Sequence, residues 1–377
     1  MVDTGNWFDV LSETRQRKFL ASQRDGLWIE VHGQKLLNFA SNDYLGLSTH
    51  AQVCAAAKAA IDKHGLGSGA SRLVSGDDPL LHEFERDFAA WKGFEACLML
   101  GSGMLANMGL LQALADRHTH IFSDKLNHAS LVDGARLSGA KVHRFSHLDL
   151  NILESQLQKN AAAKRIIVSD GVFSMDGDAA DVQTLLNLAE TYETIVVIDD
   201  AHGTGTVGTD GKGLVGQAGL AGHGRLLEVG TLGKALGSYG AYILGSASMI
   251  EGLKQRMRTL IYSTALPVCV LAGAQEALNI IKQGDLIKKL HRNIGFFLEN
   301  TQGLHLLPSQ TAIQPILLGS DIQALHAAQK LREVGFFVPA IRPPTVPQGQ
   351  SRLRVTLSAQ HQPQDIQRLI EALFNLG

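Results

Sequence analysis

The chain is poor in cysteine. Cys54, Cys97 and Cys269 are odd in number, lie far apart and show no Cys-x-x-Cys spacing. Disulfide frameworks and zinc sites need paired or clustered cysteines. We therefore expect no disulfide framework, no metal site and a reducing compartment.

An excess of charge of one sign and long hydrophobic runs are also missing. The 34 basic and 36 acidic side chains give a formal net charge of -2, which attracts neither nucleic acid nor an anionic membrane strongly. No apolar run approaches the ~18 residues that spanning a bilayer requires. The first residues, 1–7, lack the basic and apolar regions of a signal peptide. The sequence therefore predicts a soluble cytoplasmic protein that binds neither nucleic acid nor membrane.

A regular alternation of elements fills the middle of the chain. Short apolar segments predict seven strands, near 96–100, 119–123, 141–145, 165–169, 194–198, 226–230 and 240–244. Helical patterns separate most of them, at 103–115, 128–138, 149–158 and 181–191. Strands that alternate with helices predict an α/β fold, with a mainly parallel sheet covered by helices on both faces.

The two flanks of this alternation have other patterns. Before it, we expect a helix within 7–24, a hairpin over 28–39 and helices at 51–64 and 80–91. After about residue 284, strands near 313–318, 335–341 and 352–357 are interleaved with helices near 320–333 and 363–374. We predict an N-terminal segment over 1–48, a large cofactor-binding domain over 49–284 and a smaller α+β domain over 285–377. The hairpin is a candidate to join that smaller domain and make it discontinuous.

One lysine has an unusual setting. Lys234 follows the predicted strand 226–230, stands between glycines and has no carboxylate within five residues on either side. A lysine desolvated in a pocket has a lowered pKa and supplies the free amine that attacks a carbonyl. A solvated surface lysine is the common alternative.

The strand 194–198 runs directly into Asp199-Asp200-Ala201-His202. A pyridoxal 5'-phosphate (PLP) ring accepts electrons while its pyridine nitrogen stays protonated, and a buried carboxylate stabilises that proton. Asp199 suits this role, and His202 is within reach of the ring oxygen. The alternative is that Asp199 caps a helix, although Asp200 is the better candidate for a cap or an ion pair. Together with Lys234, this pattern predicts PLP bound covalently.

The glycine-rich turn after the strand 96–100 has three possible interpretations. Gly101-Ser102-Gly103-Met104 places free backbone N–H groups and the positive end of a helix where a phosphate can bind. The turn also fits G-x-G-x-x-G/A, and Asp124 lies near the end of the next strand, so a nicotinamide dinucleotide is the rival cofactor. That rival leaves Lys234 unexplained, and tight packing alone is a third possibility.

Weaker candidates lie at other strand ends. His128 is placed to lie flat over an aromatic cofactor, unless it is a core or capping residue, and Ser174 offers a hydroxyl. Arg352 and Arg354 alternate with apolar residues on a predicted strand, so that one guanidinium could meet a substrate carboxylate. Ligands of doubly wound sheets bind at such carboxyl ends. The cofactor-site candidates there are Gly103, His128, Ser174, Asp199, His202 and Lys234.

These motifs resemble the α-oxoamine synthases, which are fold-type I PLP enzymes similar to class II aminotransferases. The resemblance covers nearly the whole chain, from Asn38 to His361. Its most specific parts are Asp-x-Ala-His-Gly-x-Gly, from Asp199, and Gly-Val-Phe-Ser-Met-Asp-Gly-Asp, from Gly171. The segments 65–72 and 340–347 favour the oxononanoate-forming branch of biotin synthesis over relatives that use glycine or serine.

The resemblance implies a wider cofactor site and four catalytic residues: Lys234, His128, Asp199 and His202. Lys234 would hold PLP as an imine and later remove the Cα proton of the substrate, and Asp199 would pair with the pyridinium. His128 would stack on the ring and either orient the acyl group or aid decarboxylation. The other implied cofactor contacts are the backbone at Gly103 and Met104 and the side chains of Ser174, His202 and Thr231.

The implied reaction joins L-alanine to a pimeloyl thioester, carried by coenzyme A or acyl carrier protein, and releases CO2 and the free thiol carrier. Asn42 and Arg354 would bind the amino-acid carboxylate, and Thr345 would lie near the substrate. Arg15 and Arg17 are candidates for a further substrate contact, with Arg17 preferred.

The family implies a homodimer with its site at the interface, where Tyr262-Ser263-Thr264 would reach the partner's phosphate. The closest alternatives are another α-oxoamine synthase that uses glycine or serine, and an aminotransferase. A non-catalytic subunit is disfavoured because such subunits lack the lysine that Lys234 provides.

Overall fold

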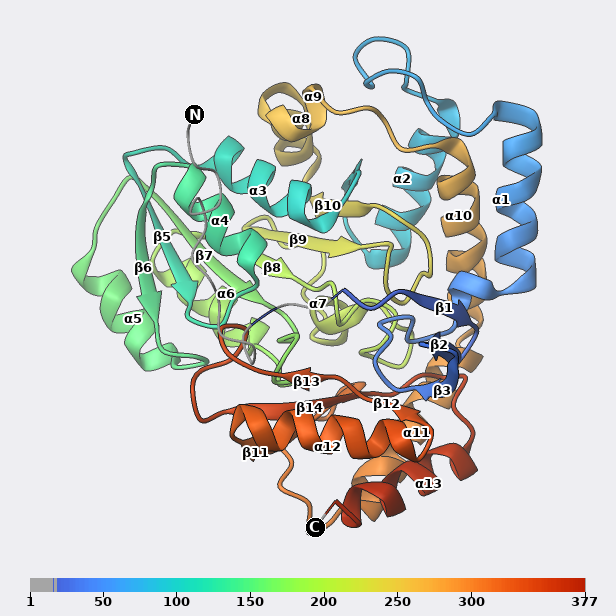
Figure 1. The fold of residues 1–377 in the computed structure, drawn as a ribbon. Helices are drawn as coiled ribbons and strands as arrows, with labels where there is room; N and C mark the ends of the chain where they lie inside the picture. The colour runs from blue at the N-terminus through green and yellow to red at the C-terminus, as the bar shows by residue number, and fades with distance from the viewer. Residues whose placement is uncertain (1–15, 17–18, 377) are drawn as a thin grey trace, which may run out of the picture.

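The computed structural model describes Gln16 and residues 19–376 (Figure 1). Most of the predicted helix within 7–24 and the candidates Arg15 and Arg17 lie outside the described residues. The end of that prediction is wrong, because β1 (Ser22–Asp25) is a strand that pairs antiparallel with β2 (Trp28–Val31).

Seven strands form the central sheet, in the order β4-β10-β9-β8-β7-β5-β6. Only β10 is antiparallel to its neighbours in this sheet, so the mainly parallel sheet is confirmed. The strands are β4 (Ala96–Leu100), β5 (Thr119–Asp124), β6 (Lys141–Phe145), β7 (Lys164–Asp170), β8 (Ile195–Asp199), β9 (Leu226–Thr231) and β10 (Ala241–Gly245). All seven fall where the sequence predicts them.

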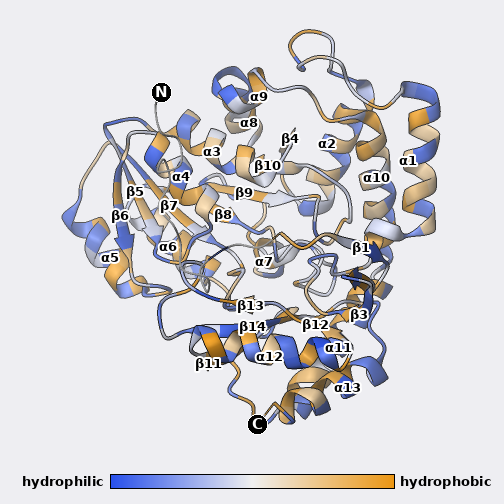
Figure 2. Cartoon of the chain, in the orientation of Figure 1, coloured by the Kyte–Doolittle hydropathy of each residue, from blue (hydrophilic) through white to orange (hydrophobic). Residues whose placement is uncertain are grey.

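Both faces of this sheet are buried, as its strands predict. Successive residues of a strand point to opposite faces. In β8, Val196 and Ile198 belong to one hydrophobic cluster and Val197 to the other. Figure 2 shows that the helices around the sheet carry both hydrophilic and hydrophobic residues, as expected for helices with one face on the core.

Ten helices accompany the sheet in the described part of the chain. They are α1 (Ala51–His64), α2 (Pro79–Lys92), α3 (Gly103–Leu114), α4 (Ala129–Leu137), α5 (Leu150–Lys159), α6 (Val182–Thr191), α7 (Gly213–Gln217), α8 (Ala247–Arg256), α9 (Arg258–Ile261) and α10 (Val268–Gln283). The first six confirm predicted helices. The side chains of Asp78, Asp149 and Asp181 cap α2, α5 and α6, and Gly93 ends α2 in the left-handed conformation (φ 85°).

The C-terminal part forms a second α+β unit below the large sheet in Figure 1. Its helices are α11 (Asp285–Asn300), α12 (Asp321–Glu333) and α13 (Pro363–Phe374), and β11 (Ile313–Gly319), β14 (Ser351–Thr356) and β13 (Ala340–Ile341) form a three-stranded sheet. The predicted single strand 335–341 is instead two strands in two sheets. Pro339 lies between β12 (Phe336–Phe337) and β13, and its missing N–H cannot continue a ladder.

The hairpin is shared between the two ends of the chain. β2 and β3 (Gln34–Asn38) pair around His32 and Gly33, which both have positive φ, as a tight two-residue hairpin turn needs. β3 then pairs in parallel with β12, so the N-terminal hairpin extends a strand of the C-terminal part. A short 3-10 helix, η3 (Leu47–Thr49), leads from there into α1.

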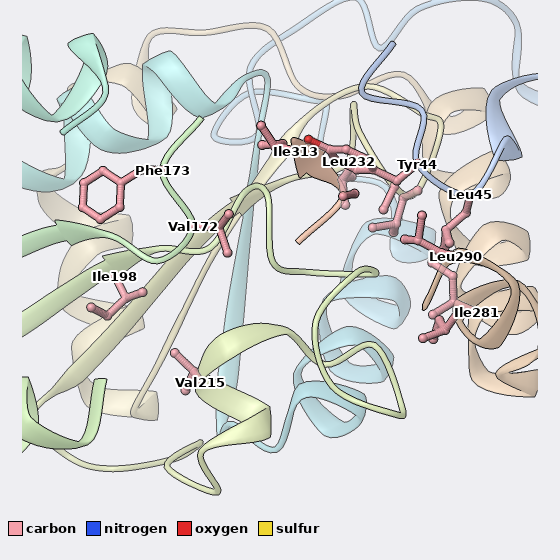
Figure 3. Packing of buried hydrophobic residues seen from close by; sticks show 14 of the residues in the cluster. Tyr44, Leu45, Val172, Phe173, Ile198, Val215, Leu232, Ile281, Leu290 and Ile313 are labelled. Atoms are coloured by element: carbon pink, nitrogen blue, oxygen red, sulfur yellow. The ribbon is translucent and has the colours of Figure 1, made fainter. Parts of the chain in front are cut away.

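One hydrophobic cluster joins all these parts (Figure 3). It contains Tyr44 after the hairpin, Ile198 of β8, Val215 of α7, Leu290 of α11 and Ile313 of β11. The segment with Tyr44 is therefore packed against both the large sheet and the C-terminal part. Within the described residues, none of the helices combines the length and apolar character that a membrane span requires.

Candidate active site

A cavity of about 200 Å³ opens at the carboxyl ends of β7, β8 and β9. Side chains from loops after several strands converge on it, as expected for a doubly wound sheet. The eight residues predicted to contact the cofactor all line it: Gly103, Met104, His128, Ser174, Asp199, His202, Thr231 and Lys234.

Lys234 meets a histidine in this cavity. Its Nζ lies 2.8 Å from Nε2 of His202. Burial, reinforced by the charge of Arg354, lowers the pKa of Lys234 to about 8, although Asp199 and Asp170 oppose that shift. Burial and the Lys234 charge also hold the pKa of His202 well below its usual value, so the imidazole is neutral. The structure therefore supplies an amine that loses its proton easily.

A chain of hydrogen bonds leads from His202 to Arg354. Tyr44 Oη lies 2.6 Å from Nδ1 of His202 and donates to Oδ1 of Asn42 at 3.3 Å. Because the Tyr44 hydroxyl donates its proton to Asn42, its oxygen accepts a hydrogen bond from Nδ1 of His202. Nε2 of His202 is then the unprotonated nitrogen and accepts from Lys234, which sets the tautomer. Arg354 Nη2 donates to the same Asn42 oxygen at 3.2 Å. Tyr44 was not predicted as a site residue, although it lies in the 38–47 motif.

Asp199 is held by an amide. Its Oδ2 accepts a 2.6 Å hydrogen bond from Nδ2 of Asn107, and its Oδ1 accepts from the backbone of Ala201 at 3.1 Å. The next helix, α7, begins only at Gly213, so Asp199 does not cap a helix. Its carboxylate is oriented by rigid neighbours and lines the cavity, which is the arrangement that a protonated ring nitrogen needs.

The same amide reaches His128 through a serine. Asn107 Nδ2 donates to Ser130 Oγ at 2.9 Å, and that hydroxyl lies 2.7 Å from Nδ1 of His128. His128 also caps α4, so the capping alternative is correct, yet its ring lines the cavity too. Burial lowers the pKa of His128, which leaves it neutral.

A second carboxyl group, Asp170, was missed by the sequence-based prediction. Asp170 ends β7 directly beside Asp199 in the parallel register, and it lines the cavity. Burial and the neighbouring Asp199 raise its pKa well above the usual value. Its position after four buried strand residues was the available signal, the same signal that identified Asp199.

The amino end of α3 presents backbone donors to the cavity. The first N–H groups of a helix have no partner within the helix, and Gly103 and Met104 hold these positions. A Cβ on Gly103 would meet no atom within 4 Å, so space is free in front of these donors. Thr231 stands nearby in the lining, but its hydroxyl donates to the carbonyl of Gly240 at 2.9 Å.

Asp124 has no oxygen left for a dinucleotide ribose. It is fully buried, and its carboxylate accepts from His147 Nδ1 at 3.0 Å and from the backbone of Leu126 and Leu148. His147 Nε2 meets Asp178 at 2.9 Å on its other side. Asp124 therefore belongs to an internal ion pair, and the structure removes the basis of the nicotinamide alternative.

The predicted substrate residues are not all brought together. Arg354 is buried, donates to Ser174 O at 2.6 Å, and no carboxylate of the described residues pairs with it. Arg352 instead pairs with Asp176 at 2.7 Å, which separates the roles of the two arginines. Thr345 lies exposed on the loop after β13 and does not line the cavity.

The cavity fits PLP on chemical grounds. It combines an amine of lowered pKa for the aldehyde, a buried carboxylate for the ring nitrogen and a free helix amino end for the phosphate. Lys234 would hold the cofactor, Asp199 would face its nitrogen, and Gly103 and Met104 would bind its phosphate.

Comparison with known proteins agrees with this fit. The family model for aminotransferase class I and II matches residues 34–373. An 8-amino-7-oxononanoate synthase from Saccharophagus degradans is 45% identical over 97% of this chain and 93% of its own length.

Two solved structures share the fold. Serine palmitoyltransferase from S. paucimobilis, solved with bound PLP, superposes with a TM-score of 0.90 at 26% identity, over 95% of this chain and 92% of its own. The 8-amino-7-oxononanoate synthase of Francisella tularensis has a TM-score of 0.78 at 31% identity, over 90% of this chain and 97% of its own. The chain therefore belongs to the aminotransferase class I and II family of fold-type I PLP enzymes and, within it, to the 8-amino-7-oxononanoate synthases.

Proposed function

We propose that this protein condenses L-alanine with a pimeloyl thioester to give 8-amino-7-oxononanoate, CO2 and the free thiol carrier. The observation that carries the chemistry is the Lys234 amine, 2.8 Å from a neutral His202 in a cavity shared with Asp199. The names of the relatives at 45% and 31% identity support the choice of substrates.

The cofactor and the protein divide the work. PLP, when bound, supplies an aldehyde that takes an amine as an imine and a protonated ring that accepts electrons from the substrate Cα. Asp199 would pair with the protonated ring nitrogen, and Asn107 holds that carboxylate in place. Ser174 and His202 would contact the ring oxygen, and His128 would cover the ring face.

Lys234 moves the proton at the alanine Cα. With alanine bound, Lys234 would be a free side chain. Its pKa near 8 leaves a minor part of it deprotonated at neutral pH and most of it above pH 8, and the deprotonated amine accepts the proton. His202 lies 2.8 Å from the Lys234 nitrogen and so aims the amine, and because the imidazole is neutral it adds no charge repulsion to this contact.

The carbon skeleton is built in two bond changes. A bond forms between the alanine Cα and the thioester carbonyl carbon while the C–S bond breaks, and the leaving thiolate takes up a proton from solvent. The bond from Cα to the alanine carboxyl carbon then breaks, and CO2 leaves. Lys234 returns a proton to Cα, which completes the balance.

Arg354 is our candidate for the alanine carboxylate. Its guanidinium donates to Asn42 and to the backbone of Ser174, both next to the cavity, and no acidic side chain of the described residues neutralises it. A guanidinium gives a carboxylate two parallel hydrogen bonds. Asn42 would share this contact. Arg17 and Thr345 remain predicted substrate contacts, although Thr345 lies exposed outside the cavity.

We further propose a homodimer with the site at its interface. Tyr262 is 72% exposed, and the neighbouring Thr264 pairs with Ser71 of the loop that precedes α2. This surface offers exposed apolar groups next to the amino end of α3, where Met104 is also exposed. The domain limits at 48/49 and 284/285 are likewise part of the proposal, as is a cytoplasmic location.

An assay of CO2 release tests the function. The purified protein, loaded with PLP, is given carboxyl-labelled L-alanine with pimeloyl-CoA or with pimeloyl-acyl carrier protein. We expect label release that depends on the thioester. Release only with glycine or serine would make it another α-oxoamine synthase, and transfer of the amino group without release would make it an aminotransferase.

A further inference from the structure

A second lysine lies on the other side of the Asp199-Asp200 pair. Lys92, at the end of α2, has a side chain with 0% exposure. Its ammonium lies 2.5 Å from Glu228 Oε1, donates to Thr204 Oγ1 at 2.9 Å and donates to the backbone carbonyl of Lys212. An ammonium has three N–H donors, so every one is used.

Two acids balance this buried charge. Glu228 pairs directly with Lys92, and Asp200 Oδ2 lies 3.8 Å from Nζ while accepting from the backbone of Leu214. Burial raises the pKa of Glu228 and raises that of Asp200 to about 8. Tyr242 Oη completes the cluster, 3.1 Å from Glu228 Oε1 and 2.6 Å from Thr204 Oγ1.

The groups held by Lys92 belong to the two segments that carry the reactive pair. Thr204 comes two residues after His202, and Lys212 ends the same loop, residues 200–212, just before α7. Glu228 lies on β9, which leads to Lys234. One ammonium therefore joins the loop of His202 to the strand that positions Lys234.

Glycines show how tightly the loop is packed on this cluster. A Cβ on Gly203 would collide with Asp200 Oδ1, and a Cβ on Gly213 would collide with Oδ2. A Cβ on Gly171, in the loop after β7, would stand 2.9 Å from Oδ1. The Asp200 carboxylate thus fills the space between three backbone segments, and the loop has little freedom while Lys92 holds its ends.

We propose that Lys92 is a positioning residue, which fixes the 200–212 loop against β9 so that His202 stays in hydrogen-bond contact with Lys234. The effect of Lys92 on catalysis rests on the proposed function of Lys234. A buried lysine costs several kcal/mol of desolvation. Here all three N–H donors of Lys92 bind the 200–212 loop or β9, and none binds α2, the helix that carries Lys92.

Loss of Lys92 should be detectable at Lys234. If the loop loosens, water reaches the amine and His202 no longer accepts from it, so the amine holds its proton to a higher pH. The other titratable or charged groups that face Lys234 come from four elements and stay in place: Asp170 of β7, Asp199 of β8, Arg354 of β14 and His128 at the start of α4. The pH at which Lys234 loses its proton therefore reports whether the 200–212 loop is held against β9.

The test uses the full-length chain stripped of PLP and follows its recapture of PLP as a function of pH. Lys92→Met should shift the midpoint of the recapture rate upward by about one pH unit or more. In the loaded enzyme, kcat should fall about 10²-fold while KM for alanine changes little, because the substrate-binding groups are untouched. Thr204→Val removes one tether without a charge change and should shift the midpoint in the same direction by a smaller amount.

Glu85→Gln is the matched control. Glu85 is a buried acid on the same helix, paired with Arg72 at 2.6 Å, and it does not touch the 200–212 loop. It should lower the melting temperature and leave the recapture midpoint at the wild-type value.

Two results would overturn the proposal. One is a wild-type recapture midpoint in Lys92→Met, with a loss of melting temperature like that of Glu85→Gln. The other, decisive if Lys92→Met does not fold, is an unshifted midpoint in Thr204→Val. Recapture needs neither alanine nor thioester, so a failure of the proposed reaction in the wild type leaves the positioning role of Lys92 separately testable.

Discussion

Two buried lysines flank the Asp199-Asp200 pair, and their surroundings differ. Lys92 donates all three of its N–H groups to protein acceptors, and one of these acceptors is the carboxylate of Glu228. Lys234 makes a hydrogen bond to a neutral imidazole and lines an open cavity. The two adjacent acids divide in the same way, because Asp199 lines the cavity and Asp200 lies in the closed cluster.

The difference teaches what makes a lysine reactive. Burial lowers the pKa of a lysine, and an adjacent anion restores it. At Lys92 all three donors are bound to protein acceptors, one of them the carboxylate of Glu228. At Lys234 the nearest partner is uncharged and Arg354 adds repulsion, so the amine is available. The predictions below separate these two kinds of site.

The largest effect is expected from the reactive lysine. Lys234→Met should reduce the rate of product formation by about 10³-fold or more, since it removes both the covalent anchor and the base. Borohydride reduction of the wild-type holoenzyme should tag a single peptide, the one with Lys234. Mass spectrometry of the digest checks this.

A tag on the Lys92 peptide would reverse the comparison. So would the retention of wild-type turnover in Lys234→Met, because the amine would then have no part in the reaction.

The two adjacent acids should respond differently to the same change. Asp199→Asn leaves the cavity without its carboxylate, so turnover should fall about 10²-fold, as expected for loss of electrostatic stabilisation in a dry site. Asp200→Asn replaces a group whose pKa is raised to about 8, and so is largely protonated, by a neutral one of the same shape. Its loss should be much smaller. Steady-state kinetics with alanine would show the opposite order if Asp200 faced the cofactor.

The two arginines of β14 offer a third contrast. Arg354→Met should raise KM for alanine about 10- to 100-fold, the worth of a charge-assisted hydrogen-bond pair. Arg352→Met breaks the pair with Asp176 and should instead lower the melting temperature. Alanine titrations of both variants check the assignment, which is wrong if KM rises in Arg352→Met alone.

The fold was largely predictable because its signals are local. Apolar strands bounded by capping residues, such as Asp149 and Asp181, mark β/α alternation in any context. The split between β12 and β13 was missed although Pro339 marks it, since only the pairing of β12 with the distant β3 shows that the two strands belong to different sheets. The sequence-based prediction also omitted the helices α10 and α11. The apolar faces of these helices pack against α1 and α13, and this packing is visible only in the folded structure.

The residues of the candidate site that lie just after the ends of strands could be predicted from the sequence. Lys234, Asp199 and His202 were found because glycines and an apolar strand single them out. Tyr44 and Asn107 were missed as site residues, since their roles exist only through contacts with His202 and Asp199 across long sequence separations. The Lys92 cluster joins α2, the 200–212 loop and β9, and no spacing along the chain indicates it.

The smallest effect concerns a third charged cluster, which behaves as Lys92 does and unlike Lys234. His147 bridges Asp124 and Asp178, and these two acids raise its pKa to about 10 against the desolvation that opposes them. The folded pKa exceeds the ordinary value of about 6.5, so this contribution to stability is complete below pH ~6.5 and is lost as the pH rises through about 10. Between pH 7 and 9 we expect the free energy of unfolding to fall by about 2–3 kcal/mol from this group. Urea denaturation of the wild type and of His147→Gln at several pH values isolates this contribution, because the variant should lack this part of the pH dependence. If the free energy of unfolding falls equally steeply with pH in the two proteins, His147 is not charged in the folded state.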